Sequence, residues 1–165
     1  MVNSTLDPYT RYREMVENGQ LKEDENQACV VDKFQHLFLS LKNYTVPQNK
    51  FFLNRFFFKQ TYKENPKGLY IYGSVGRGKS MLMDLFYDLA PILEKRRVHF
   101  HAFMIEIHKE IHAWRYMDRE SRIEKFGTAL DDPIPPLAEN IAKESKLLCF
   151  DEFQVTDVTD AMILG

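Results

Sequence analysis

The feature that most constrains this chain is a glycine-rich stretch, Gly73-Ser74-Val75-Gly76-Arg77-Gly78-Lys79-Ser80. It matches G-x-x-x-x-G-K-[ST], the phosphate-binding P-loop pattern, at every fixed position. The glycines let the backbone curl, so that successive N–H groups and the start of the following helix face one concavity that binds phosphate oxygens. The lysine can reach the β- and γ-phosphates, and the hydroxyl after it can bind Mg²⁺. We therefore expect a nucleotide site over Gly73–Met81, with Lys79 acting in catalysis and Ser80 at the metal.

The segments on either side of this stretch strengthen the interpretation. The run 68–72 (Gly-Leu-Tyr-Ile-Tyr) is short and apolar and predicts a β-strand that leads into the loop. After the loop, apolar side chains recur at helical spacing at Met81, Leu82, Leu85, Phe86 and Leu89. A strand before the pattern and a helix after it form the context in which a P-loop match is informative.

A second motif supplies acidic groups. The apolar run 147–150 is followed directly by Asp151 and Glu152. An unbroken apolar run predicts a central parallel strand buried on both faces, and the carboxyl end of such a strand is where ligands bind in open α/β sheets. Asp151 at that end can hold Mg²⁺, mostly through water, and an adjacent glutamate can orient and deprotonate an attacking water. We assign Asp151 to the metal and Glu152 to general-base catalysis.

The other segments predict an alternation of helices and strands around these motifs. We expect helices at 7–18 (with Asp7 as N-cap), 23–42, 102–116 and 135–144, strands at 98–101 and 146–150, and a solvated charged excursion at 117–132. Alternating strands and helices predict an α/β fold with a parallel sheet and right-handed crossovers. We divide the chain into an N-terminal helical lead-in with a linker, 1–66, and a P-loop core, 67–165.

Several features allow two interpretations. Five phenylalanines fall within 51–58, before a polar linker at 60–67, and predict either an aromatic helix packed on the core or an exposed contact surface for a partner or a membrane interface. Arg77 either touches a phosphate or faces solvent, and Arg96 and Arg97 either serve a neighbouring subunit or simply flank a strand.

Histidines at 99, 101, 108 and 112 raise the question of a metal. The zinc-protease pattern requires a glutamate directly after the first helical histidine, and Lys109 stands there. We therefore expect core-facing histidines on the strand and half-exposed ones on the helix rather than a zinc site.

Composition excludes several classes. The formal net charge of −2 over 165 residues provides no basic patch for nucleic acid. No stretch is apolar for long enough to span a membrane, and the first 20 residues resemble neither a signal peptide nor a transit peptide. The two cysteines, Cys29 and Cys149, lie far apart, and the apolar run around Cys149 favours a buried thiol in a reducing compartment over a disulfide.

With both motifs placed, the chain resembles the ZapE/Afg-one-like ATPase family, a branch of the AAA-type P-loop ATPases. The stretches that carry the resemblance are 68–80, 83–87, 98–104 and above all 148–162 (LCFDEFQVTDVTDAM), together with Asp24 and Gln27 in the lead-in helix. The resemblance implies an Mg-ATP hydrolase with the three-layer parallel sheet of that class. It further implies a protein partner, in cell division for bacterial members and in protein quality control for mitochondrial ones.

The resemblance also implies where the protein acts. Bacterial members lie in the cytoplasm or peripherally at the inner membrane, and the missing transit peptide favours that type over a mitochondrial one. In the family, a sensor strand and an arginine that serves a neighbouring subunit of a homo-oligomer lie beyond residue 165. We therefore expect this chain to be a fragment truncated after the Walker B strand, poorly stable and catalytically weak, because a sheet without its central strand leaves backbone groups unpaired.

Three functions are compatible with these residues. The first is an ATPase whose cycle remodels a partner protein. The second is an ATP-binding switch or adaptor with little turnover, which the truncation favours. The third is a small-molecule or nucleoside kinase, for which the segment 117–132, with Arg119 and Arg122, is the only candidate lid.

Overall fold

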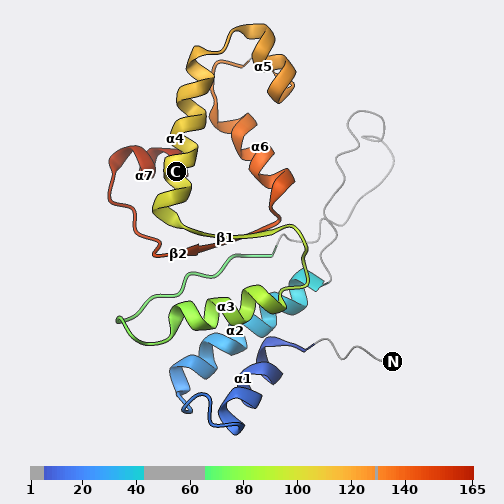
Figure 1. The fold of residues 1–165 in the computed structure, drawn as a ribbon, viewed down its shortest axis with the longest axis vertical. Helices are drawn as coiled ribbons and strands as arrows, with labels where there is room; N and C mark the ends of the chain where they lie inside the picture. The colour runs from blue at the N-terminus through green and yellow to red at the C-terminus, as the bar shows by residue number, and fades with distance from the viewer. Residues whose placement is uncertain (1–5, 43–65, 129) are drawn as a thin grey trace. The chain divides into compact units, whose positions relative to one another are not determined.

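A computed structural model describes residues 6–42, 66–128 and 130–165 (Figure 1). The phenylalanine-rich stretch 51–58 and most of the expected linker at 60–67 lie outside the described residues. The chain forms two compact units, Met1–Pro91 and Ile92–Gly165. This division differs from the boundary expected at residue 66, because the helix after the glycine-rich loop packs on the lead-in helices. No helix in the described ranges is long and apolar enough to cross a membrane.

The described residues of the first unit form three helices: α1 (Pro8–Glu17), α2 (Glu25–Lys42) and α3 (Lys79–Leu89). As expected, Asp7 is the N-cap of α1, and its carboxylate accepts a hydrogen bond from the Thr10 N–H at 2.8 Å. The rings of Phe34 on α2 and Phe86 on α3 stack with their centroids 4.7 Å apart. The buried apolar side chains of this unit are Tyr12, Val31, Phe34, Phe38, Leu41, Leu82, Leu85, Phe86 and Ala90.

The strand expected at 68–72 does not form. These residues have no regular secondary structure, and Leu69, Tyr70 and Tyr72 are exposed. A β-strand is held by hydrogen bonds to a neighbouring strand, and no described segment forms a ladder with 68–72. An apolar, β-prone sequence therefore leads into the loop without regular secondary structure.

The second unit combines two strands with four helices. Strand β1 (Lys95–His99) pairs in parallel with β2 (Leu147–Asp151), and Lys95 lies opposite Leu147 and His99 opposite Asp151. The helices are α4 (Phe100–Tyr116), α5 (Arg119–Phe126), α6 (Ile134–Glu144) and α7 (Val158–Leu164). Between them lies a core made of Phe100, Phe103, Met104, Ile107, Ile111 and Leu137, against which Leu148 and Phe150 of β2 pack.

Three expectations about this unit need correction, whereas the charged excursion at 117–132 is solvated as expected. The strand expected at 98–101 begins at Lys95 and ends at His99. A helix starts at Phe100, whose ring is buried in the core. The excursion at 117–132 contains α5, a helix without buried residues that Asp118 caps at its start and Gly127 at its end. In β2 only Cys149 is buried, because β1 is its one partner in the described sheet. His99 and His101 are exposed rather than core-facing, since the strand ends between them.

The two thiols lie in different environments. Cys29 is exposed on α2, whereas Cys149 is buried in β2, as expected, and its burial raises the pKa of its thiol against the opposing effects of Lys95 and Arg97. Because the thiolate is the nucleophile, burial and a raised pKa both suppress reaction with an alkylating reagent.

We expect iodoacetamide to modify Cys29 readily and Cys149 only as the second unit unfolds. Peptide mass spectrometry after timed labelling measures both rates in one sample. A Cys29→Ser variant isolates the slow site, and urea should bring its rate up to that of Cys29. Equal rates at the two thiols without urea would contradict the burial of Cys149.

Candidate phosphate-binding site

The glycine-rich loop runs directly into α3. Gly76 and Gly78 have φ angles of 79° and 78°, in the left-handed region that a side chain makes costly. The first backbone hydrogen bond of α3 runs from the Leu82 N–H to the Gly78 carbonyl, at 3.0 Å. The helix therefore starts directly after the loop, at Lys79, so the positive end of its dipole lies next to the loop. This is the local geometry that binds an anion.

The ammonium group of Lys79 lies over the same loop. Its Nζ donates hydrogen bonds to the backbone oxygens of Gly73, at 3.0 Å, and Ser74, at 2.9 Å. The side chain therefore folds back from the start of α3 across the loop that precedes it. A positive charge so placed can contact phosphate oxygens that approach the loop.

The loop opens onto a pocket of about 500 Å³ within the first unit. Ligand pockets in proteins have volumes of roughly 300–1,000 Å³, so the pocket can hold a molecule of nucleotide size. Its wall joins the start of α2 to the loop and the start of α3. The lining residues are Asp24, Asn26, Gln27, Val30, Ile71, Tyr72, Gly73, Ser74, Arg77, Lys79 and Leu82.

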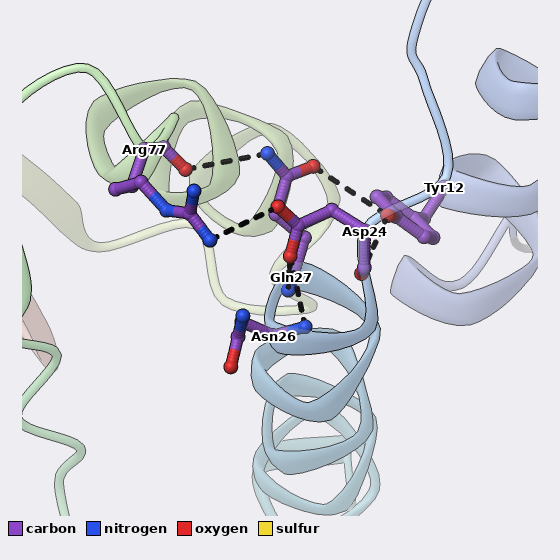
Figure 2. Close-up of polar contacts among 5 residues, drawn as sticks. All are labelled: Tyr12, Asp24, Asn26, Gln27 and Arg77. Atoms are coloured by element: carbon purple, nitrogen blue, oxygen red, sulfur yellow. Dashed lines mark hydrogen bonds and ion pairs between the residues drawn. The ribbon is translucent and has the colours of Figure 1, made fainter.

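Residues at the start of α2 bind the loop directly (Figure 2). Gln27 donates from Nε2 to the backbone oxygen of Arg77, at 3.2 Å, and the Arg77 guanidinium lies 3.3 Å from Asp24 Oδ2. The other carboxylate oxygen of Asp24 accepts the backbone N–H groups of Asn26, at 2.8 Å, and Gln27, at 3.1 Å. The Tyr12 hydroxyl lies 3.4 Å from the Asp24 carbonyl oxygen.

The Arg77 guanidinium thus points towards Asp24. The Gln27 N–H, more than any other donor, lowers the pKa of the Asp24 carboxyl, and Asn26 and the charge of Arg77 act in the same direction. Gly78 allows the approach, because a Cβ at that position would lie 3.0 Å from Gln27 Nε2. Asp24 and Gln27 were expected in the lead-in helix, but nothing in the spacing relates that segment to the loop.

The acidic pair lies in the second unit, at the end of β2. Asp151 Oδ2 accepts a hydrogen bond from Arg97 at 3.0 Å, and Oδ1 accepts the backbone N–H of Glu152 at 3.1 Å. Arg97 thus binds the residue expected to hold the metal, a contact that sequence reasoning missed; the register of a parallel pair, with Arg97 opposite Cys149, could have suggested it. Glu152 is exposed and has a φ of 51°, a sparsely populated conformation for a residue with a side chain.

In the segment that follows the acidic pair, a buried carboxylate on α7 contacts α4. Asp160 on α7 is 7% exposed, and its Oδ1 lies 2.6 Å from His108 Nε2 on α4. Asp157 caps α7 by accepting the Thr159 N–H. No cluster of three or more metal-binding side chains occurs among the described residues. His108 is half-buried and lies against the Asp160 carboxylate, on another helix.

Comparison with known proteins identifies relatives along the whole chain. A model of the family described as AFG1-like ATPase matches residues 6–165. Lactation elevated protein 1 homolog B of Danio rerio is 52% identical over 99 residues, which cover 60% of this chain and 19% of that protein. Cell division protein ZapE of Escherichia coli K12 is 34% identical over 168 residues, which cover 98% of this chain and 41% of ZapE. The chain thus spans less than half the length of these relatives, and no solved structure matches it.

The pair between His108 and Asp160 should contribute measurably to the stability of the second unit. We expect His108→Ala to lower the free energy of unfolding by about 1–3 kcal/mol, because it leaves a buried carboxylate without its partner. Urea unfolding followed by the fluorescence of Trp114, the single tryptophan and a buried residue of this unit, measures the change.

His112→Ala is the matched control, since that ring is exposed and lies against Tyr116 one turn further along α4. It should leave the midpoint nearly unchanged. Equal effects of the two substitutions would show that the contact with Asp160 contributes nothing of its own.

Proposed function

The chain belongs to the AFG1-like ATPase family, and on this premise we propose that it binds ATP with Mg²⁺ at Gly73–Met81 and that its family fold hydrolyses the γ-phosphate. Membership implies a P-loop NTPase fold and the use of a nucleotide with Mg²⁺. The observation that best supports the proposal is Lys79 folded over a left-handed glycine loop that opens onto a pocket of about 500 Å³.

The loop residues would bind the triphosphate. Backbone N–H groups at the start of α3 donate to phosphate oxygens, and Lys79 exchanges its bonds to the Gly73 and Ser74 carbonyls for bonds to the phosphates. A charge-assisted bond to phosphate is stronger than a bond to a neutral carbonyl, so this exchange favours the bound state. Lys79 thus lies close to where the phosphates would bind.

Ser80 and Asp151 are the residues we propose for Mg²⁺. Hydroxyl and carboxylate oxygens are the ligands this hard cation prefers, usually together with several waters. Asp151, which accepts hydrogen bonds from Arg97 and the Glu152 N–H, would hold the cation through bound water. Bound Mg²⁺ would neutralise charge on the β- and γ-phosphate oxygens.

Glu152 is the residue we propose as general base. Its carboxylate would accept a proton from the water that attacks the γ-phosphate. Its positive φ is a strained conformation of the kind that concentrates at functional sites, because the surrounding structure must hold it in place.

The action of the whole protein follows from the relatives as a proposal. ZapE is named a cell division protein, and we propose that this family member likewise couples ATP to work on a protein partner, in the cytoplasm or at the periphery of a membrane, as a homo-oligomer. A mitochondrial role in protein quality control is the counterpart for members of the eukaryotic type. A switch that binds ATP with little turnover is the second candidate, and the Arg97 contact favours it because that cation competes with Mg²⁺ for Asp151.

Two substitutions separate binding from turnover in the 165-residue chain. Lys79→Ala should abolish Mg-ATP binding measured by calorimetry, because the charge over the loop is lost. Glu152→Gln should preserve binding and lower turnover by about 10²–10⁴-fold, the usual contribution of a general base. Binding that survives Lys79→Ala would contradict the phosphate site. Binding with equally low turnover in wild type and Glu152→Gln would favour the switch.

A further inference from the structure

The Arg77 side chain lies within the glycine-rich loop and could either bind phosphate or hold the loop. Its guanidinium pairs with Asp24 Oδ2 at 3.3 Å, while its own carbonyl oxygen accepts the Gln27 amide at 3.2 Å (Figure 2). Both contacts come from the start of α2, and together they bind the loop through its backbone and a side chain. We call this group of three residues, Asp24, Gln27 and Arg77, the α2–loop clasp.

We propose that the clasp positions the glycine-rich loop for phosphate binding, with Arg77 and Asp24 as positioning residues rather than phosphate ligands. The inference rests on the proposed function and adds to it the contribution of the lead-in helix. A loop with left-handed glycines at 76 and 78 has many conformations open to it, so contacts that fix one of them lower the entropy lost when phosphate binds.

The carboxylate of Asp24 has two roles in the clasp. One oxygen caps α2 through the N–H groups of Asn26 and Gln27, and this orients the second oxygen towards Arg77. The Asp24 side chain is 27% exposed and that of Arg77 53% exposed. An ion pair so accessible to water contributes little to stability by itself. Its effect is therefore to hold the loop in one orientation.

The clasp also resolves an electrostatic conflict at the pocket. A carboxylate that lines a triphosphate site repels the ligand unless a cation neutralises it, and Asp24 lines this pocket. Each single substitution would therefore both break the ion pair and leave an unpaired charge beside the ligand. Asp24→Asn frees a positive charge beside the ligand, and Arg77→Gln frees a negative one.

The test removes both charges at once. The double variant Asp24→Asn/Arg77→Gln has the net charge of wild type and keeps a capping side chain on α2, since Asn caps a helix as well as Asp does. We expect it to bind Mg-ATP about three- to tenfold more weakly than wild type, the effect of losing one partly exposed ion pair and the order it imposes. Arg77→Lys, which keeps the charge pair, should bind more tightly than Arg77→Gln.

The matched control is Arg13→Gln/Glu17→Gln. These residues form an ion pair of 3.1 Å on α1 in the same unit, with both side chains mostly exposed, and neither lines the pocket. This variant should bind Mg-ATP as wild type does. Wild-type affinity in the clasp double variant, or an equal loss in the control, would overturn the proposal.

A second readout does not depend on ATP. In the chain without nucleotide, amide hydrogen exchange over residues 73–81 should be faster in the clasp double variant than in wild type and unchanged in the control. If wild type shows no Lys79-dependent ATP binding, the proposed function fails, yet this exchange still tests whether the clasp orders the loop. Unchanged exchange in the clasp variant would overturn that part directly.

Discussion

The contact between the Phe34 and Phe86 rings is the interaction on which the first unit depends. It holds α2 against α3 within a core of buried apolar side chains, and both helices begin at the same pocket. Because apolar burial is non-directional, aliphatic contacts alone would specify the orientation of α2 and α3 less well. Stacked aromatic rings have a preferred geometry and define that orientation more closely. The polar starts of both helices therefore line the same pocket, and the glycine-rich loop lies between the two starts.

The electrostatics of that space follow from the two helix starts. The start of a helix carries partial positive charge and favours an anion. At α2 the anion is part of the chain, the carboxylate of Asp24, whereas at α3 the loop and Lys79 leave room for an external one. Arg77 neutralises the charge of Asp24, so this carboxylate does not repel an anion that binds at α3. The pocket is thus suited to a negatively charged ligand although an acidic side chain lines it.

The sequence predicted those features that local chemistry determines. The cap of α1 by Asp7, the helix after the glycine loop and the helix expected at 102–116 depend on residues close together in the chain. The contacts of Arg77 with Asp24 and of His108 with Asp160 join segments about fifty residues apart, and no periodicity encodes them. The strand expected at 68–72 and the burial expected for β2 failed for one reason, since both depend on neighbouring strands that the described residues do not supply.

The central claim is that the loop binds nucleotide phosphates and that the start of α2 takes part because it shares their pocket. Amide hydrogen exchange with and without Mg-ATP tests both halves in the 165-residue chain. We predict slower exchange on ATP addition in residues 73–81 and also at 24–30, with neither change in Lys79→Ala. Exchange at 73–81 that ATP does not alter would contradict the phosphate site. Slower exchange confined to 73–81 would contradict the participation of α2.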